Sequence, residues 1–497
     1  MKYRILTIIA VALPLACSCN KWLDITPEDT TTEAQLFTTA SGYHAAINGL
    51  YQTMATSSLY GQNLTWGYLS ALSQYYDNVS SDDSKSYSFT EKYEYDSKEV
   101  LGYGEQIWQT GYNVIANANN ILQHLAEADE NIFTEKAKGE IELIKGEALA
   151  VRALIHFDLL RLFADSPAVN KDAKAIPYVK EYPAFFSERL TVEKVLNNVT
   201  VDLKAAASLV AITDTISGNS NSYMTNATNR FLVSNSSRNY FFTGRGSRLN
   251  YVGISALLAR VYAYAGDMQN AYSQALEVDK YFEDGEGWYK YTTSFTDTDS
   301  EANRPHKLID ELLVCFYNEN LSTDYTSTVS SSTKSRNSYA LKNLDGIFSD
   351  SNDARMKKLV TNVGTDVKIS LKYLERSGSS SLISSENKVV PVMRFSEIKL
   401  LLAECLAKQG KMDEAVAILD KLLIARKCAV SGMNASTPVE DFLNAVRMEV
   451  WRENVAEGQY FFYCKRINAE TIDNNGVHVP MTGKYTMQIP DTQVNIN

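Results

Sequence analysis

The sequence has little of what most enzymes use to move protons. Only 5 of its 497 residues are histidine. It contains no G-x-S-x-G, H-E-x-x-H or glycine-rich phosphate-binding motif. Asp82 and Asp83 are adjacent in a polar stretch, so by themselves they cannot flank a glycosidic bond, which requires two carboxylates about 5–9 Å apart. These absences argue against a glycoside hydrolase and favour a protein that is not an enzyme.

Cysteine and positive charge are also scarce. Beyond the N-terminal region the cysteines are Cys315, Cys405, Cys428 and Cys464, far apart and without metal-ligand spacing. We therefore predict no metal site and no cofactor, leave the disulfide state of these cysteines open, and expect Cys405 to be a small core residue. The net charge of −11 makes the chain a poor binder of nucleic acid.

No N-terminal run is long enough to span a bilayer. Residues 5–16 form an apolar stretch of about 12 residues after Lys2 and Arg4, the pattern of a signal peptide. Cys17-Ser18-Cys19 follows at once, as at a bacterial lipoprotein cleavage site. We predict a signal peptide over residues 1–18 and acylation of Cys19. Cys17 remains an alternative, and so does an ordinary secretory signal with an incidental cysteine.

Tyrosine and long helical patterns are abundant. Thirty tyrosines against five histidines suit a surface that binds by stacking and hydroxyl contacts. Residues 135–169 predict one helix of about 28 residues, about 42 Å long, which ends before Pro167. Its polar residues form two narrow stripes, Lys145, Arg152 and His156 on one and Glu147, Asp158 and Arg161 on the other. Two apolar faces remain, so we expect this helix inside a layered helical array.

Two internal repeats indicate the architecture. Residues 257–278 align without gaps to residues 401–422, and each copy reads as helix, glycine turn, helix. Gly266 and Gly410 end the first helix of each copy, while Ala271 and Ala415 let the paired helices approach closely. These are tetratricopeptide-like hairpins, and residues 106–128 with the long helix make a third pair. The fold class is therefore mainly α, a helical-repeat scaffold with a large, irregular, loop-rich region inserted between repeats.

The rest of the chain is predicted to contain further helices, one strand and long loops. We expect further helices over residues 32–54, 190–210 and 438–457, and a strand at the end of residues 308–317. A polar, aromatic-rich stretch over residues 55–104 and polar stretches over residues 211–248 and 318–339 read as loops.

Five segments in order resemble the SusD/RagB family of outer-membrane nutrient-binding lipoproteins. They are CNKWLDITP (Cys19–Pro27), AVRALIHFDLLRLFADSPAV (Ala150–Val169), PVMRFSEIKLLLAECLAKQG (Pro391–Gly410), VRMEVWRENVAEGQYFFYCKR (Val446–Arg466) and MQIPDTQVNIN (Met487–Asn497). The resemblance covers nearly the whole chain. Ala164 stands where the family usually has Gly, Ser166 where it has Val or Ile, and Tyr463 where Asp is common.

The resemblance implies a surface-exposed, lipid-anchored protein of the outer membrane that binds oligosaccharide and is not an enzyme. It implies that the protein acts as the lid of a TonB-dependent transporter β-barrel. It also divides residues 19–497 into a scaffold, about 105–282 and 392–466, and ligand-side loops, about 55–104 and 283–390. The alternatives are a partner-docking scaffold without a ligand, or a peptide-binding subunit of such a transporter.

In that family the ligand site is built from an early loop and one after the third helical pair. Sugars present C–H faces that stack on aromatic rings and hydroxyls that bind amides and carboxylates. The expected glycan-binding residues are Trp66, Tyr75, Tyr76, Asp77, Asn78, Tyr325, Asn337 and Tyr339. For each aromatic residue, local packing is the competing interpretation. We interpret Arg394, Glu397, Glu404, Arg447, Glu453, Glu457 and Arg466 as structural ion pairs and hydrogen bonds of the C-terminal helices.

Overall fold

The computed structural model of the chain describes residues 33–78, 85–184, 187–215, 217–218, 221–233, 240–293, 305–378, 380–472 and 478–490. The lipidation candidates Cys19 and Cys17 and the acidic pair Asp82 and Asp83 lie outside these residues.

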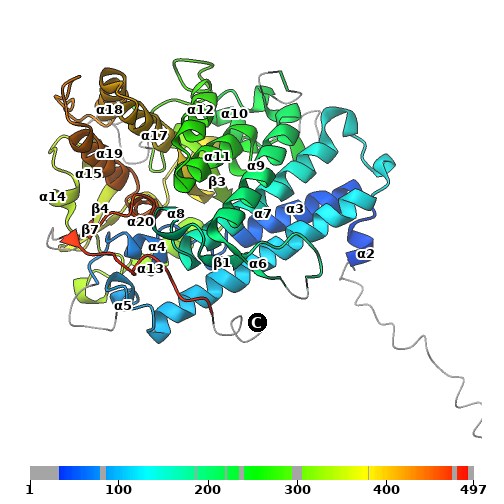
Figure 1. The fold of residues 1–497 in the computed structure, drawn as a ribbon, viewed down its shortest axis with the longest axis horizontal. Helices are drawn as coiled ribbons and strands as arrows, with labels where there is room; N and C mark the ends of the chain where they lie inside the picture. The colour runs from blue at the N-terminus through cyan, green and yellow to red at the C-terminus, as the bar shows by residue number, and fades with distance from the viewer. Residues whose placement is uncertain are drawn as a thin grey trace, which may run out of the picture.

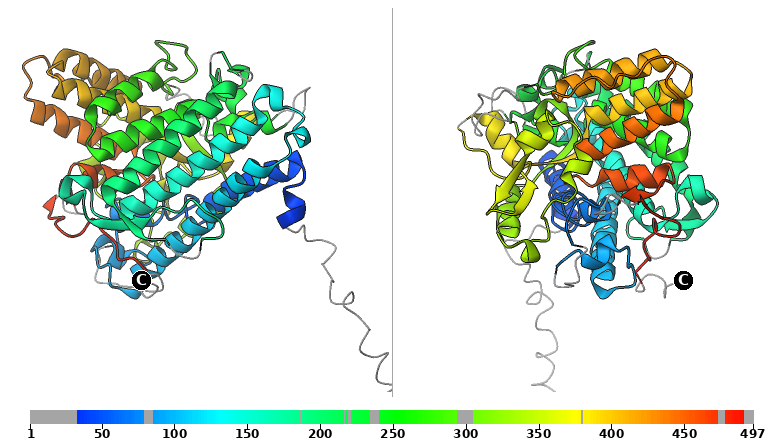
Figure 2. Two further views of the ribbon diagram at one scale, coloured as in Figure 1. Left: turned by 45° about the vertical axis from the view of Figure 1, so that its right-hand side comes forward. Right: turned by 90° about the vertical axis from the view of Figure 1, so that its left-hand side faces the viewer.

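Helices packed side by side form most of the molecule (Figures 1 and 2). They are α3 (Ala40–Met54), α6 (Lys98–Glu127), α7 (Glu140–Phe163), α9 (Val192–Asp214), α11 (Tyr251–Ala265), α12 (Met268–Asp279), α17 (Phe395–Lys408), α18 (Met412–Ala425), α19 (Val439–Glu453) and α20 (Gln459–Arg466). Helix α7 packs between α6 and α9, α9 contacts α11, and α12 contacts α17. The prediction of a mainly helical, tetratricopeptide-like scaffold is confirmed.

Helix α7 lies inside this array, as its two apolar faces predict. Every residue from Gly146 to Phe163 is buried. The helix is shorter than expected, because Gly139 adopts a left-handed conformation (φ 85°) before its first residue. It also ends before Ser166. Lys465 Nζ donates hydrogen bonds to the carbonyl oxygens of Arg161 and Ala164, at 2.7 and 2.5 Å, and so caps the last turn.

Pro167 therefore does not end α7. It begins a separate short helix, α8 (Pro167–Asn170), at the first helical position, where its missing N–H is harmless.

The polar stripes of α7 form hydrogen bonds and ion pairs with neighbouring segments. Arg152 donates to both carboxylate oxygens of Asp202 on α9, at 2.7 and 2.9 Å, and to Asn119 on α6 at 2.9 Å. Glu147 on the other stripe accepts from Arg245 and Arg248 in the segment before α11. Lys145 is exposed and takes no part in this buried polar set.

Both glycine hairpins have the expected geometry. Gly266 (φ 81°) ends α11 before α12, and Gly410 (φ 78°) lies between α17 and α18. Both φ angles lie in the left-handed region that favours glycine. Ala271 and Ala415 are fully buried where the paired helices meet. The repeat assignment is therefore confirmed.

Short elements fill the inserted segments, which are less irregular than the sequence predicted. The short helices are α2 (Glu33–Leu36), α4 (Tyr68–Leu72), α5 (Ser88–Glu91), α10 (Ala227–Phe231), α13 (Leu321–Val329), α14 (Leu344–Ile347), α15 (Ala354–Leu359) and α16 (Ser381–Lys388). In the described part of the chain, the strands pair as four two-stranded antiparallel sheets, β1 (Lys174–Pro177) with β2 (Arg189–Thr191), β3 (Leu312–Tyr317) with β6 (Val389–Arg394), β4 (Val360–Val363) with β5 (Val367–Ser370), and β7 (Thr471–Ile472) with β8 (His478–Val479). The predicted strand at the end of residues 308–317 is β3.

Candidate ligand-binding site

The two inserted segments that carry the predicted glycan-binding residues meet in space. Tyr76 and Leu341 form an isolated antiparallel bridge. Asp77 N donates to Ala340 O at 2.8 Å, and Lys342 N donates to Tyr75 O at 3.0 Å. Backbone pairing therefore holds the early and late candidate residues in one region, although they are more than 200 positions apart in the chain.

An aromatic cluster forms where the segments meet. The ring centroid of Trp66 lies 5.0 Å from that of Tyr325 and 5.4 Å from that of Tyr339. Tyr76 and Tyr339 are also 5.4 Å apart, with their planes at 71°. Tyr87, which was not among the predicted residues, lies edge-on to Tyr339 at 5.5 Å. Edge-to-face pairs at these distances stabilise the cluster beyond the area that they bury.

Seven of the eight predicted residues are buried in this cluster or beneath it: Trp66, Tyr75, Tyr76, Asn78, Tyr325, Asn337 and Tyr339. Most of their polar atoms bind backbone carbonyl oxygens. Tyr75 OH donates to Trp451 O at 2.7 Å, Tyr325 OH to Ser370 O at 2.8 Å, and Trp66 Nε1 to Gly61 O at 2.7 Å. As placed, these side chains hold the inserted segments together.

The two predicted asparagines also donate hydrogen bonds to backbone carbonyl oxygens. Asn78 Nδ2 donates to Ser338 O at 3.0 Å, so it ties the early segment to the late one. Asn337 Nδ2 donates to Val329 O and Ser331 O at 3.0 and 2.8 Å. Asp77 is the exception among the eight, because its side chain is 24% exposed and pairs with Lys334 Nζ at 2.9 Å.

Direct glycan contact by these residues stays a prediction, and burial favours a supporting role for most of them. The part-exposed rim of the cluster consists of Gln62, Asp77 and Tyr103. Gln62 Nε2 donates to Tyr339 OH at 2.8 Å, and Tyr339 OH lies 3.1 Å from Tyr87 OH. Sequence reasoning missed Gln62, Tyr87 and Tyr103. Their location in the aromatic-rich residues 55–104 was the available signal.

Burial keeps the phenols of the cluster neutral. It raises the pKa of Tyr76, Tyr87 and Tyr325 well above the usual value for tyrosine, and the neighbouring phenols add to the shift. Burial also raises the pKa of Glu91, although Lys342 Nζ lies 3.0 Å from its carboxylate and opposes the shift. At neutral pH the cluster therefore offers hydroxyl groups, not phenolates.

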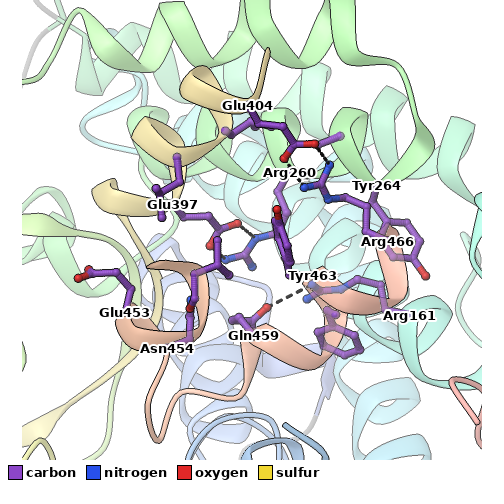
Figure 3. A pocket seen from close by; sticks show the side chains of 15 residues that line it. Arg161, Arg260, Tyr264, Glu397, Glu404, Glu453, Asn454, Gln459, Tyr463 and Arg466 are labelled. Atoms are coloured by element: carbon purple, nitrogen blue, oxygen red, sulfur yellow. Dashed lines mark hydrogen bonds and ion pairs between the residues drawn. The ribbon is translucent and has the colours of Figure 1, made fainter. Parts of the chain in front are cut away.

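A separate hollow lies in the scaffold, among α7, α11, α17, α19 and α20 (Figure 3). Its cavity volume is about 70 Å³, and it is partly open to solvent. Its lining side chains are Arg161, Arg260, Ala263, Tyr264, Glu397, Leu400, Leu401, Glu404, Val450, Glu453, Asn454, Gln459, Phe462, Tyr463 and Arg466. Charged, aromatic and aliphatic groups therefore share one wall.

Each arginine of this hollow is paired. Arg260 donates to both oxygens of Glu397 at 2.6 Å, and Arg466 donates to both oxygens of Glu404 at 3.0 and 2.5 Å (Figure 3). Arg161 pairs with Asp158 and donates to Gln459 Oε1 at 3.2 Å. The interpretation of Glu397, Glu404 and Arg466 as structural ion pairs is confirmed.

The other charged residues of the family-like segments are also held by neighbours. Glu457 pairs with Arg394, and Glu453 with Arg426 and Arg355. Arg447 donates to Tyr460 OH at 3.1 Å.

His156 on α7 is fully buried. His156 stacks on Tyr178, with ring centroids 3.9 Å apart, and its Nε2 lies 3.0 Å from Val179 N. Burial lowers the pKa of His156 to about 3, so its ring is neutral and accepts that hydrogen bond.

Within the described ranges, no three His, Cys, Asp or Glu side chains are grouped to hold a metal ion. The described cysteines Cys315, Cys405, Cys428 and Cys464 are free thiols. Cys405 is buried in α17, as expected of a small core residue.

Two family models match the chain. Residues 21–230 match a model described as "Starch-binding associating with outer membrane", and residues 207–496 match the model of the SusD family. The SusD-like protein P2 of Formosa agariphila is 27% identical over 189 residues, which cover 37% of this chain and 34% of that protein. The matched region thus spans about a third of the length of this curated relative.

Solved structures share the fold over nearly the whole chain. A SusD superfamily protein from Bacteroides thetaiotaomicron VPI-5482 is 21% identical, with a TM-score of 0.68 over 92% of this chain and 98% of that one. A SusD-like carbohydrate-binding protein from Bacteroides vulgatus ATCC 8482 is 17% identical, with a TM-score of 0.68 over 92% and 96%. A laminarin-binding SusD-like protein is 18% identical, with a TM-score of 0.64 over 91% and 97%. The fold and the family model, which matches more than half of the sequence, agree that this chain belongs to the SusD family.

Proposed function

We propose that this protein binds oligosaccharide at its loop-rich region and delivers it, as the lid subunit, to a TonB-dependent transporter of the outer membrane. Acylation of Cys19 after removal of residues 1–18 anchors it at the cell surface. It performs no chemistry on its ligand. The scaffold, about residues 105–282 and 392–466, faces the transporter, and the segments at about 55–104 and 283–390 face the ligand.

The observation that carries this proposal is the meeting of two distant inserted segments in one aromatic cluster with a polar, part-exposed rim. Such a rim combines aromatic rings and hydrogen-bonding groups, which is what a sugar surface requires. The description of the matching N-terminal model as starch-binding supports a glycan, and so does the laminarin-binding protein of the same fold.

Burial assigns different roles to the eight residues of the predicted site. We propose that Asp77, together with Gln62 and Tyr103, contacts the glycan, because these side chains are part-exposed. Trp66, Tyr75, Tyr76, Asn78, Tyr325, Asn337 and Tyr339 position that rim from beneath. Gln62 reaches the cluster through Tyr339, so rim and support are joined by a 2.8 Å hydrogen bond.

Affinity electrophoresis and calorimetry of the mature chain without its lipid, against a polysaccharide panel that includes starch and laminarin, test the proposal. Gln62→Ala should weaken binding of the recognised glycan by about three- to tenfold, the effect of losing one neutral hydrogen bond. It should lower the melting temperature only slightly, because Tyr339 OH loses the bond to Gln62 but keeps its contact with Tyr87 OH. Gln109→Ala, an exposed glutamine on α6, is the matched control and should bind as the wild type does.

Two results would decide against the proposal. Failure to bind any glycan, with peptide binding or transporter association intact, would favour a peptide-binding or docking subunit. Release of product from a labelled oligosaccharide would identify a hydrolase instead.

A further inference from the structure

A second hollow lies at the edge of the scaffold, where α18 and α19 meet the segments that carry residues 349–353 and 428–433 (Figure 1). We call it the edge pocket. Its cavity volume is about 260 Å³, against about 70 Å³ for the hollow of Figure 3. Drug-sized ligands occupy about 300–1,000 Å³. The edge pocket therefore fits one long side chain or a small molecule, not an oligosaccharide.

Hydrogen bonds hold the walls of the edge pocket in place. Helices α18 and α19 both pack against α17. Ala429 N donates to Asp350 Oδ2 at 2.8 Å, and Ser431 N donates to Asp420 Oδ1 at 2.7 Å. The segment over residues 428–433 is thereby tied to α18 and to the segment before α15. A preformed wall reduces the ordering that binding requires.

Methionine and aliphatic side chains form the apolar part of the lining. Leu419 and Leu423 of α18 are buried, whereas Met433 and, on α19, Ala445 and Met448 are part-exposed. Methionine adapts its shape to a partner and is enriched at protein interfaces. This part of the wall therefore suits the C–H groups of a partner's side chain.

Large apolar side chains are also exposed next to lining residues in the chain. Ile424, which follows Leu423, is 58% exposed, and Val430, between Ala429 and Ser431, is 55% exposed. Exposed apolar side chains beside a cavity are typical of a surface that binds another protein.

Most charged groups at the edge pocket are balanced within its wall. Arg355 Nη2 lies 2.6 Å from Asp353 Oδ2, and its Nη1 lies 2.8 Å from Glu449 Oε2. Arg452 also pairs with Glu449 and donates to Ile347 O at 2.6 Å. Both guanidinium groups are thus already engaged, so the wall does not attract an anion.

Asp350 is the charged group of the lining that lacks a cationic partner among the described residues. Its carboxylate accepts from the backbone N–H groups of Ala429 and Asn352, each at 2.8 Å. These hydrogen bonds lower the pKa of Asp350, so the carboxylate is charged at neutral pH. Because its side chain is part-exposed, it can attract a cation to the pocket.

We propose that the edge pocket receives an arginine side chain from a segment of a partner protein. The aliphatic stem of arginine packs on Met433 and Met448, and its planar guanidinium group pairs with Asp350. The chain's own net charge of −11 disfavours a second copy as the partner. A sugar is disfavoured because none of the described lining residues is aromatic. The inference does not rest on glycan binding, which concerns the loop-rich region.

NMR of the mature chain without its lipid, with methyl-labelled methionine, tests this proposal. Met433→Leu and Met448→Leu assign the two methyl signals of the pocket. Titration with the peptide acetyl-Gly-Arg-Gly-amide should shift both signals. The peptide acetyl-Gly-norleucine-Gly-amide keeps an aliphatic stem but has no cation, so it should bind about two- to fivefold more weakly, the range of one part-exposed ion pair.

Two variants, each with a matched control, test the pocket itself. Ala445→Phe fills it from α19 and should abolish the peptide-induced shifts without lowering the melting temperature, whereas Ala417→Phe, exposed on α18 and outside the lining, should not affect binding. Asp350→Asn should weaken binding of the arginine peptide by about two- to fivefold. Asp413→Asn, also exposed on α18 and outside the lining, should leave it unchanged.

No shift with the arginine peptide, shifts that persist in Ala445→Phe, or equal binding of the two peptides would each overturn the proposal. Unchanged affinity in Asp350→Asn, or binding of D-glucose in place of the peptide, would do the same. None of these results bears on the polysaccharide panel or on Gln62→Ala, so this inference and the proposed function fail separately.

Discussion

The scaffold and the loop-rich region both bury ion pairs, but the loop-rich region also uses tyrosine hydroxyl groups to satisfy backbone carbonyl oxygens. Helices of the scaffold satisfy their own backbone, so buried side chains of neighbouring helices pair with each other, as Arg152 does with Asp202. The inserted segments leave many carbonyl oxygens without a ladder partner, and tyrosine supplies the donors. Tyr93 OH donates to Leu72 O at 3.0 Å and Tyr373 OH to Ala456 O at 2.9 Å. Much of the chain's tyrosine therefore serves architecture, although its abundance first suggested a binding surface.

The largest expected effect is the loss of a buried cation in the scaffold. Arg245 is fully buried and pairs with Glu147 and with Asp214, the latter at 2.7 Å. Arg245→Met leaves two buried carboxylates short of a partner and should lower the free energy of unfolding by about 3–5 kcal/mol. Urea denaturation of the wild type and the variant measures this loss of stability.

Lys171→Met, which breaks the exposed pair with Glu193, is the control and should not shift the urea midpoint. An equal effect of both variants would remove the distinction between buried and exposed pairs.

Acid should weaken the scaffold through Glu404. Burial alone would raise the pKa of Glu404, but Arg466 and Lys408 outweigh it and lower that pKa to about 2. Its stabilising contribution is complete above about 4.5, the unfolded value, and is lost as the pH falls toward 2. Glu404→Gln should flatten the fall of the urea midpoint in that window, whereas Glu414→Gln, at an exposed site, should not.

For the buried phenols the pH dependence of stability has the opposite sign. Burial raises the pKa of Tyr76 and Tyr325, so their contribution is complete below about pH 10, where unfolded tyrosine begins to ionise. Stability should then fall as the pH rises further. A midpoint that stays flat from pH 10 to pH 11 would contradict the assignment of these phenols as buried donors.

A smaller effect is expected from a single loop hydroxyl. Tyr325→Phe removes the donor to Ser370 O and leaves that carbonyl oxygen unsatisfied, which should lower the free energy of unfolding by about 1–2 kcal/mol. Tyr264→Phe, whose hydroxyl has no partner in the described residues, should cost nothing in the same measurement. Equal losses in the two variants would mean that ring packing, not the hydrogen bond, determines the cost.

The scaffold could be predicted from the sequence because its signals are local. Period-3.6 apolar residues and the glycines at 266 and 410 determine the hairpins within a few turns of chain. The end of α7 could not be predicted, because its cap is Lys465, about 300 positions later. Likewise, Trp66 and Tyr76 are recognisable as aromatic loop residues, but whether they face solvent depends on the path of residues 318–342. Local sequence does not encode that path.

The cap on α7 also joins two distant parts of the chain into one unit. Lys465 Nζ binds Arg161 O, Ala164 O and Tyr485 O, and Met487 N donates to Leu162 O at 2.9 Å. The central helix thus receives its last hydrogen bonds from residues about 300 positions later in the chain. Local opening of the segment around Tyr485 therefore also opens the end of the central helix, so the two should exchange their amide hydrogens as one cooperative unit.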